Sequence, residues 1–114
     1  MHDYQTLRYY LFGAISLEEA KEQMEDIRLF IDSKWIPYED FNEQMDAIVE
    51  YMEIILDAQI KKREEIADRI ETFLINIHSD EVFMYLAKKV IKNEQILKHL
   101  KVSQTLLDRF KKLA

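Results

Sequence analysis

Two groups of acidic side chains are the residues in this chain whose type and spacing could hold a metal ion. The first group lies in residues 18–22 and the second in residues 43–46. Magnesium takes hard oxygen ligands in octahedral geometry, so a protein site needs several converging carboxylates while water molecules complete the shell. The spaced carboxylates are therefore a candidate magnesium site.

The sequence Glu18-Glu19-Ala20-Lys21-Glu22, followed by Glu43-Gln44-Met45-Asp46, resembles the acidic motifs of the MazG-like nucleotide pyrophosphohydrolases. The resemblance implies an all-helical enzyme in which magnesium bridges the phosphates of a nucleoside triphosphate. The residues that it places at the metal are Glu18, Glu19, Glu22 and Asp46, with Glu43 beside them. Glu18 and Glu19 also have a structural explanation, because acids are favoured in the first turn of a helix and Glu19 completes a capping box with Ser16.

The histidines and the single glycine indicate no other catalytic site. A carboxylate-bridged di-iron bundle needs a glutamate three residues before a histidine, but Ile75 and Ile96 stand at that spacing before His78 and His99. One glycine cannot build a phosphate-binding loop, and the absence of cysteine excludes a thiol nucleophile or a thiolate metal site. We therefore assign no catalytic residue.

The stretch from Ser79 to Ala114 contains a second kind of candidate site. Ser79, Asn93 and Ser103 are suited to cap helices, which predicts helices over 80 to about 92, 94 to about 100, and 104 to 114. Two short helices that cross steeply need apolar residues at a few fixed offsets. The residues at those offsets are Ile96, Leu100, Val102, Leu107 and Phe110.

Residues 95–110 resemble the helix-turn-helix DNA-binding family. The resemblance implies that the last helix lies in the major groove of DNA. It assigns DNA contacts to Ser103, Gln104, Thr105, Asp108, Arg109 and Lys112, of which Arg109 and Lys112 would contact phosphates. Lys101 stands where the family has a turn glycine, so it is expected to adopt a left-handed backbone conformation. The alternative is a plain helical hairpin that closes a bundle.

The charge distribution divides the chain at the same point. Residues 1–78 contain 18 acidic and 8 basic residues, a net charge of −10, whereas residues 79–114 contain 4 and 8, a net charge of +4. Local positive charge is what gives a protein affinity for phosphates. The same lysines could equally solvate amphipathic helices.

Composition predicts an all-α chain. One Gly and one Pro leave little material for loops, and apolar residues recur at three- and four-residue spacing among 33% charged residues. At 114 residues we expect one continuous domain, with an acidic scaffold over 1–78 and a basic helix-turn-helix-like region over 79–114. No stretch resembles a membrane span or a signal peptide, so we expect a cytoplasmic protein.

The acidic scaffold is expected to begin with two short helices. An aromatic helix over about 4–12 should end at Gly13, the natural C-terminal cap. A second helix should begin at the Ser16 capping box and run to about Lys34, with Trp35-Ile36-Pro37 at the following corner.

Residues 38–78 contain no helix breaker. Apolar residues stay in step through the polar segment 59–65, which predicts one helix of about forty residues rather than two helices joined by a turn in 60–65. A second apolar seam would suit pairing with another copy. The residues of this seam are Met45, Ile48, Met52, Ile55, Ile66, Ile70, Phe73 and Ile77.

The leading functional hypothesis is a small DNA-binding regulator, dimeric through the long helix. The second hypothesis is a non-enzymatic helical module that binds another protein, as an inhibitor or adaptor. The third is the magnesium-dependent nucleotide pyrophosphohydrolase. No partner, operator or target follows from the sequence itself.

Overall fold

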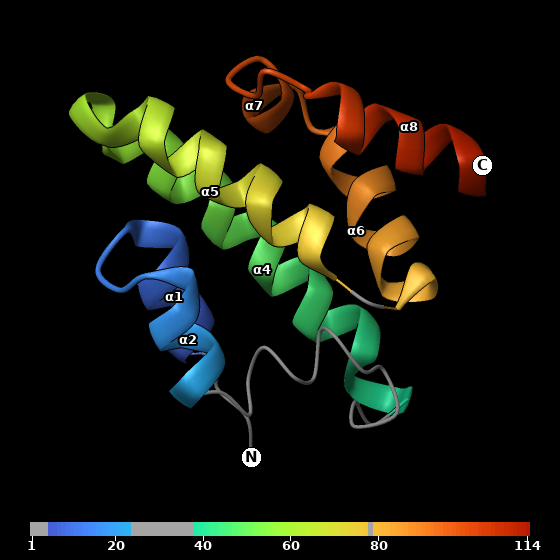
Figure 1. Cartoon of the computed structure of the whole chain (residues 1–114), viewed down its shortest axis with the longest axis horizontal. Helices are drawn as coiled ribbons and strands as arrows, with labels where there is room; N and C mark the ends of the chain where they lie inside the picture. The colour runs from blue at the N-terminus through green and yellow to red at the C-terminus, as the bar shows by residue number, and fades with distance from the viewer. Residues whose placement is uncertain (1–4, 24–37, 78) are drawn as a thin grey trace.

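The computed structural model describes residues 5–23, 38–77 and 79–114, and its fold is all-α, as the composition predicts (Figure 1). No helix in these described ranges is long and apolar enough to cross a membrane. The elements in chain order are α1 (Gln5–Phe12), α2 (Leu17–Gln23), α4 (Tyr38–Ala58), the 3-10 helix η2 (Ile60–Lys62), α5 (Arg63–Asn76), α6 (Asp80–Lys92), α7 (Glu94–Leu97) and α8 (Gln104–Leu113).

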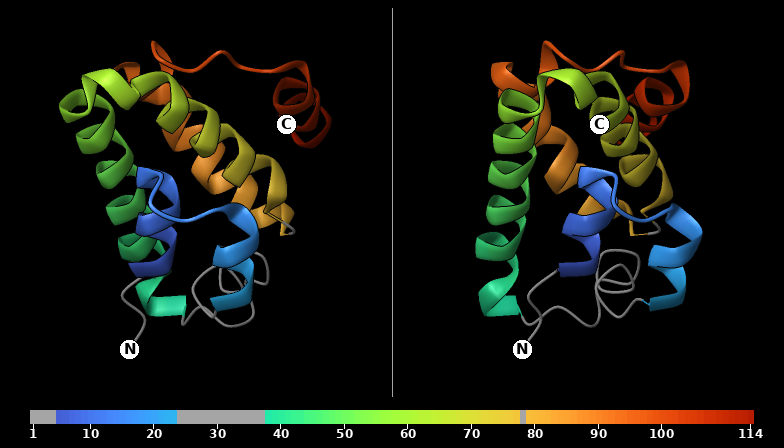
Figure 2. Two further views of the ribbon diagram at one scale, coloured as in Figure 1. Left: turned by 60° about the vertical axis from the view of Figure 1, so that its left-hand side comes forward. Right: turned by 90° about the vertical axis from the view of Figure 1, so that its left-hand side faces the viewer.

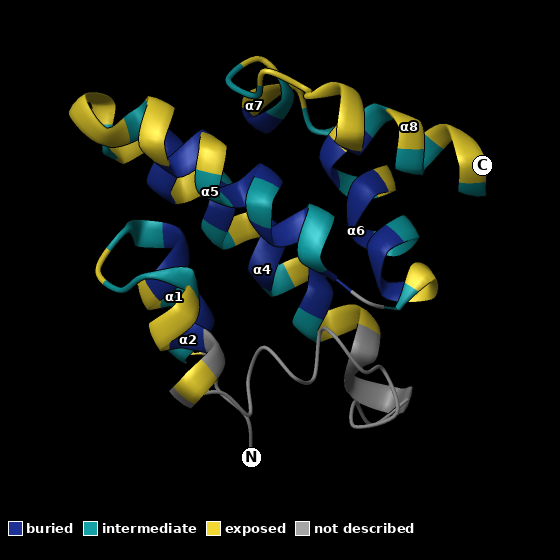
Figure 3. Ribbon diagram, viewed as in Figure 1, coloured by how far each residue is buried: buried dark blue, intermediate teal, exposed yellow. Residues whose placement is uncertain are grey.

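A hairpin of α4 and α5 forms the centre of the molecule. The two helices meet at η2 and diverge from there (Figure 2). Helices α1 and α2 lie on one side of the hairpin, and α6, α7 and α8 lie on the other. Buried residues gather where α1, α4, α5 and α6 face one another, whereas α8 contributes only Leu106 to the core (Figure 3).

The prediction of one continuous helix over residues 38–78 is wrong. The chain leaves the helical conformation at Gln59, whose φ and ψ are −101° and 68°. The Nε of Arg63 donates to the carbonyl of Leu56 at 2.7 Å, and its Nη2 donates to the carbonyl of Asp57 at 3.3 Å. These bonds satisfy carbonyls that the end of α4 leaves without a helical partner. The two-helix alternative with a turn near residues 60–65 is the observed one.

The apolar seam that suggested a dimer lies inside a single chain. All eight of its residues are buried, with exposed fractions of 0 to 4%. Folding α4 back on α5 places the two halves of the seam in one core, so the partner helix comes from the same chain. The reason for expecting a homodimer through a long helix is therefore removed.

Local signals in the first helices are confirmed. Gly13 has a φ of +95°. The N–H of Ala14 donates to the carbonyl of Tyr9, five residues earlier, at 2.8 Å, which is the hydrogen bond typical of a helix that ends at a glycine. The Ser16 hydroxyl accepts from the N–H of Glu19 at 3.1 Å, and the Glu19 carboxylate accepts from the N–H of Ser16 at 3.3 Å, which is the capping box. The expected continuation of α2 to Lys34 and the corner at 35–37 lie outside the described residues.

Candidate functional site

The three helices of residues 79–114 begin where the caps predict. The side chains of Ser79, Asn93 and Ser103 each accept a hydrogen bond from the backbone N–H three residues on, at 3.1 to 3.3 Å. The middle helix is shorter than expected, because α7 ends at Leu97 and not near Leu100. A linker of residues 98–103, which begins with a turn at residues 98–99, therefore separates α7 from α8.

This linker is held by one buried carboxylate. Glu71, on α5, is 5% exposed. Its carboxylate accepts from the backbone N–H groups of Lys101, Val102 and Ser103 at 2.9, 3.2 and 2.8 Å. A carboxylate with several charge-assisted hydrogen bonds is stably accommodated in a protein interior. Glu71 thus fixes the start of α8 against α5.

The left-handed residue of the linker is Val102, with a φ of 54°, and not Lys101 as predicted. Successive N–H groups can point at one anion only when the backbone turns between right- and left-handed conformations, so the Glu71 bonds select this position. The Lys101 ammonium instead lies 3.1 Å from Glu64 and 3.6 Å from Asp68. The hydrogen bond to Glu64 raises the pKa of Lys101, and the charge of Asp68 acts in the same direction.

Most of the proposed DNA-contacting residues share one exposed stripe of α8. Gln104, Asp108 and Lys112 follow one another at four-residue spacing, with Thr105 beside them, and all four are exposed. The Gln104 amide donates to the Asp108 carboxylate at 2.6 Å. The Ser103 hydroxyl caps the helix.

Arg109 points into the fold. Its Nη1 donates to the carbonyls of Leu74 and Ile75 at 3.2 and 3.1 Å, and its Nη2 lies 3.2 Å from the Asp80 carboxylate. The guanidinium also stacks 4.1 Å from the centre of the Phe83 ring. Arg109 therefore caps the end of α5 and ties α8 to α6, instead of standing free at the surface.

The structure does not bring the two acidic motifs together at one ion. Asp46 contacts Lys89 at 2.9 Å and Tyr85 at 3.3 Å, while Glu19 is part of the capping box. Among the residues that the structure describes, no group of three or more His, Cys, Asp or Glu side chains could hold a metal ion. The other proposed carboxylates, all exposed, are Glu18, Glu22 and Glu43. The magnesium site remains a prediction.

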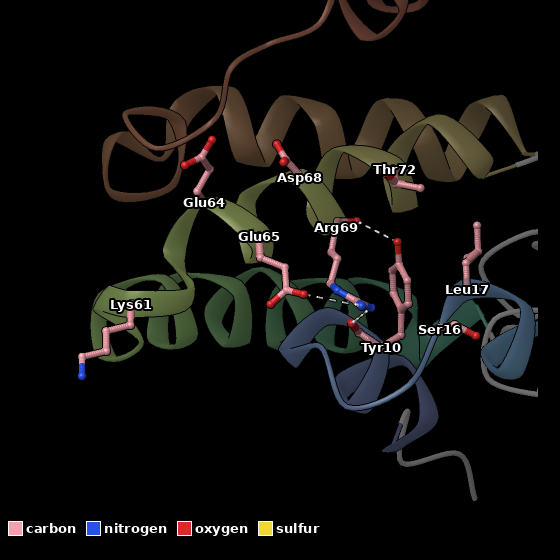
Figure 4. A pocket seen from close by; sticks show the side chains of 9 residues that line it. All are labelled: Tyr10, Ser16, Leu17, Lys61, Glu64, Glu65, Asp68, Arg69 and Thr72. Carbon is pink, nitrogen blue, oxygen red and sulfur yellow. Dashed lines mark hydrogen bonds and ion pairs between the residues drawn. The ribbon is translucent and has the colours of Figure 1, made fainter.

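A hollow of about 630 Å³ lies between α5 and the α1–α2 loop (Figure 4). Its central polar group, Arg69, donates through Nη1 to the carbonyls of Tyr10 and Ile15 at 3.0 and 2.8 Å. Burial raises the pKa of Tyr10, and the hydroxyl donates to the carbonyl of Arg69 at 3.4 Å. These groups fasten the loop to α5. The lining residues are Tyr10, Ser16, Leu17, Lys61, Glu64, Glu65, Asp68, Arg69 and Thr72.

A second hollow, of about 410 Å³, lies between α4 and α7 and is acidic. Glu50, Glu53 and Asp57 line it together with His99. Burial lowers the pKa of His99, and the positive charge of Arg63 acts in the same direction. The hollow therefore combines three carboxylates with His99, Ile54 and Gln95.

An apolar groove opens between α6, α7, the linker and α8, and we call it the α6–α8 groove. Its lining presents only apolar atoms around a space of about 40 Å³. Ile91 and Val102 stand at its edge with exposed fractions of 43% and 36%. The lining residues are Leu74, Ala87, Val90, Ile91, Leu97, Leu100, Val102, Leu106, Leu107 and Phe110.

The sequence predictions missed this groove. Residues 82–87 and 90–91 of α6 are apolar, more than one buried stripe needs, and this excess was the available signal for a second apolar face. In α8 the expected apolar residues were Leu107 and Phe110, but the structure buries Leu106, which is 8% exposed, and leaves Leu107 and Phe110 half-buried. All three line the groove. The register of α8 thus turns Leu107 toward the groove.

Two surfaces of the basic region remain as candidates for binding, the α6–α8 groove and the exposed stripe of α8. The first is apolar and the second is polar, so they suit different partners. Comparison with protein-family models, with curated proteins and with solved structures gives no match.

Proposed function

We propose that this protein is a non-enzymatic helical interaction module that binds a segment of another protein in the α6–α8 groove. The observation that supports the proposal is the groove itself, an exclusively apolar lining that opens at the surface beside the exposed Ile91 and Val102. A partner that covers this lining displaces the water in contact with it. Burying the apolar surface stabilises the complex by about 25 cal/mol per Å². A small apolar side chain of the partner that enters the groove would contribute most of the binding free energy.

The conformation of Val102 supports the same proposal. A β-branched residue at a φ of 54° is strained by about 1–3 kcal/mol, and strain of this kind concentrates at functional sites. This backbone conformation places the isopropyl group of Val102 at the edge of the groove. A glycine would adopt the same conformation without strain but would provide no apolar side chain there. Three hydrogen bonds to Glu71 hold this backbone in place.

The test is a peptide library displayed on phage and selected on the wild-type protein. Replacing Ile91 with Asp should weaken binding of the selected peptides by about tenfold or more, because a charge enters the site that the anchor must desolvate. Ile54→Asp is the matched control, since Ile54 is 54% exposed on α4 and lies outside the groove. Equal binding to both variants, with folding verified by circular dichroism, would reject the groove as the site.

A second candidate function is DNA binding, supported by the exposed stripe of α8 and the +4 charge of residues 79–114. In this candidate Gln104 and Thr105 contact base edges, Asp108 follows one turn later, and Lys112 contacts phosphate. Arg109 contributes by holding α8 in place. A cytoplasmic setting suits either function, because a chain without cysteine fits a reducing compartment.

The DNA candidate predicts different effects for two neighbouring substitutions. Gln104→Ala should reduce discrimination between duplexes by about 1–3 kcal/mol, because a glutamine can pair with adenine through two hydrogen bonds. Lys112→Ala should weaken binding to all sequences alike and flatten the salt dependence by about one unit. Fluorescence anisotropy with random and genomic duplexes at two salt concentrations measures both. No salt-sensitive binding by the folded protein would eliminate this candidate.

A further inference from the structure

Apart from Arg109, which pairs with Asp80, the basic residues of 79–114 fall into two sets. Two lysines pair with carboxylates of the acidic scaffold: Lys89 lies 2.9 Å from Asp46, and Lys101 lies 3.1 Å from Glu64. A second set forms no ion pair with any carboxylate in the described ranges. Its members are Lys88, Lys92, Lys98, Lys111 and Lys112. Positive charge without an internal ion pair is therefore left on this region, and Lys92, one of the five, lines a hollow that it shares with acidic residues of α4.

Three of the unpaired lysines border the α6–α8 groove. Lys88 precedes Ile91 by three residues on α6, and Lys111 follows Leu107 by four residues on α8, so each shares a helix face with a lining residue. Lys98 directly follows Leu97 at the end of α7. All three side chains are exposed. The apolar groove consequently has cationic groups from α6, from α8 and from the start of the linker directly after α7.

The volume of the groove limits the size of the partner side chain that can enter it, which we call the anchor. A volume of about 40 Å³ exceeds the roughly 10–15 Å³ that one water molecule requires, but it is far below the roughly 150 Å³ of a cavity that holds a benzene ring. The groove therefore has room for the methyl end of one aliphatic side chain and not for an aromatic ring. A partner helix presents such an anchor with its neighbours three and four residues away on the same face. Carboxylates flanking that face would meet the lysines.

We infer that the α6–α8 groove binds an acidic amphipathic helix of a partner protein, with the methyl end of one aliphatic anchor side chain in the groove and carboxylates beside Lys88, Lys98 and Lys111. This inference rests on the proposed function. Charge complementarity between an acidic helix and this rim accelerates encounter and sets the orientation, while the apolar anchor slows dissociation. The positive rim also disfavours basic segments of the same shape.

The experiment uses the whole protein and three labelled synthetic peptides of about 16 residues, long enough to form a helix when bound. The first peptide has two leucines one turn apart, flanked by glutamates. The second has lysine in place of every glutamate, and the third keeps the glutamates but has serine in place of both leucines. Fluorescence anisotropy is measured at about 50 mM and about 300 mM salt, where screening differs strongly.

We expect the acidic leucine peptide to bind about tenfold or more tightly than either other peptide, and to weaken as salt rises. The double variant Lys88→Glu with Lys111→Glu should lose this preference and favour the basic peptide. Lys61→Glu is the matched control, because Lys61 is an exposed lysine of η2 outside the groove and should leave the preference unchanged.

Four outcomes would overturn the inference in distinguishable ways. Equal binding of acidic and basic leucine peptides, both abolished by Ile91→Asp, would leave the groove as the site and refute its charge selectivity. Equal binding of the acidic leucine and serine peptides would reduce the interaction to charge alone, as expected of a surface for DNA. Self-association that blocks the peptides and is broken by Ile91→Asp but not by Ile54→Asp would make the occupant a second copy of this chain. Failure of all three peptides, when library-selected peptides still bind in the groove, would refute the inference and leave the proposed function intact.

Discussion

Replacing Glu71 with Leu should lower the free energy of unfolding by about 3 kcal/mol or more, one of the two largest effects expected of a single substitution in this protein. Leucine fills much of the same space but accepts no hydrogen bond. The N–H groups of Lys101, Val102 and Ser103 would then lose their acceptor at a buried position. Urea denaturation followed by circular dichroism measures the loss.

Two further substitutions separate this effect from a simple loss of charge. Glu71→Gln keeps one acceptor oxygen, so its free energy of unfolding should lie between those of the wild type and of Glu71→Leu. Glu64→Gln removes an exposed carboxylate whose partner is the Lys101 side chain, and it should change stability by less than about 1 kcal/mol. A Glu71→Leu protein as stable as the wild type would mean that the linker is held by its apolar contacts alone.

The second large effect is expected at Phe83. Phe83→Ala should cost about 3–5 kcal/mol, because a fully buried ring is removed and its cavity is only partly closed. The guanidinium of Arg109 would also lose the aromatic face on which it stacks, a contribution of about 1 kcal/mol. Calorimetry of the variant measures the combined loss.

Phe83→Leu is the control for this prediction. It retains most of the apolar volume and should cost about 1.5 kcal/mol or less. Combining Phe83→Ala with Arg109→Ala tests the stacking, since neighbouring residues that interact give non-additive losses. Strict additivity of the two losses would show that the ring and the guanidinium do not stabilise each other.

The parts of the fold that follow from the sequence are those set by neighbouring residues. Ser79, Asn93 and Ser103 each begin a helix because a short polar side chain satisfies an N–H three residues on. Gly13 ends α1 because it adopts a positive φ without strain from a side chain. These are local rules, so no tertiary knowledge was needed.

The break between α4 and α5 could not be predicted in the same way. No Gly or Pro stands in residues 57–65, and the apolar spacing runs through without a shift. The chain turns because Arg63 reaches back six and seven residues to the carbonyls of Asp57 and Leu56, and because the two halves of the seam bury each other. Burial across a hairpin depends on which helix faces meet. The periodicity of apolar residues in the sequence indicates that apolar faces exist but not which of them pack together.

The candidate site shows the same division between local and distant causes. Gln104 and Thr105 are exposed in the first turn of α8, as helix geometry predicts from the Ser103 cap. Arg109 was expected at the surface, yet its partners Leu74 and Asp80 lie 35 and 29 residues away in the chain. The sequence also gave no reason to expect that Glu71, one acid among many, would hold a linker thirty residues later.

Under the proposed function, the left-handed Val102 sets thermostability and partner recognition against each other. An asparagine at this position would tolerate the same backbone with less strain and would still donate its N–H to Glu71. It would also put a polar amide where the isopropyl group now borders the α6–α8 groove. Selection for stability alone would therefore replace this valine, so a stabilised asparagine variant would gain heat resistance at the expense of affinity.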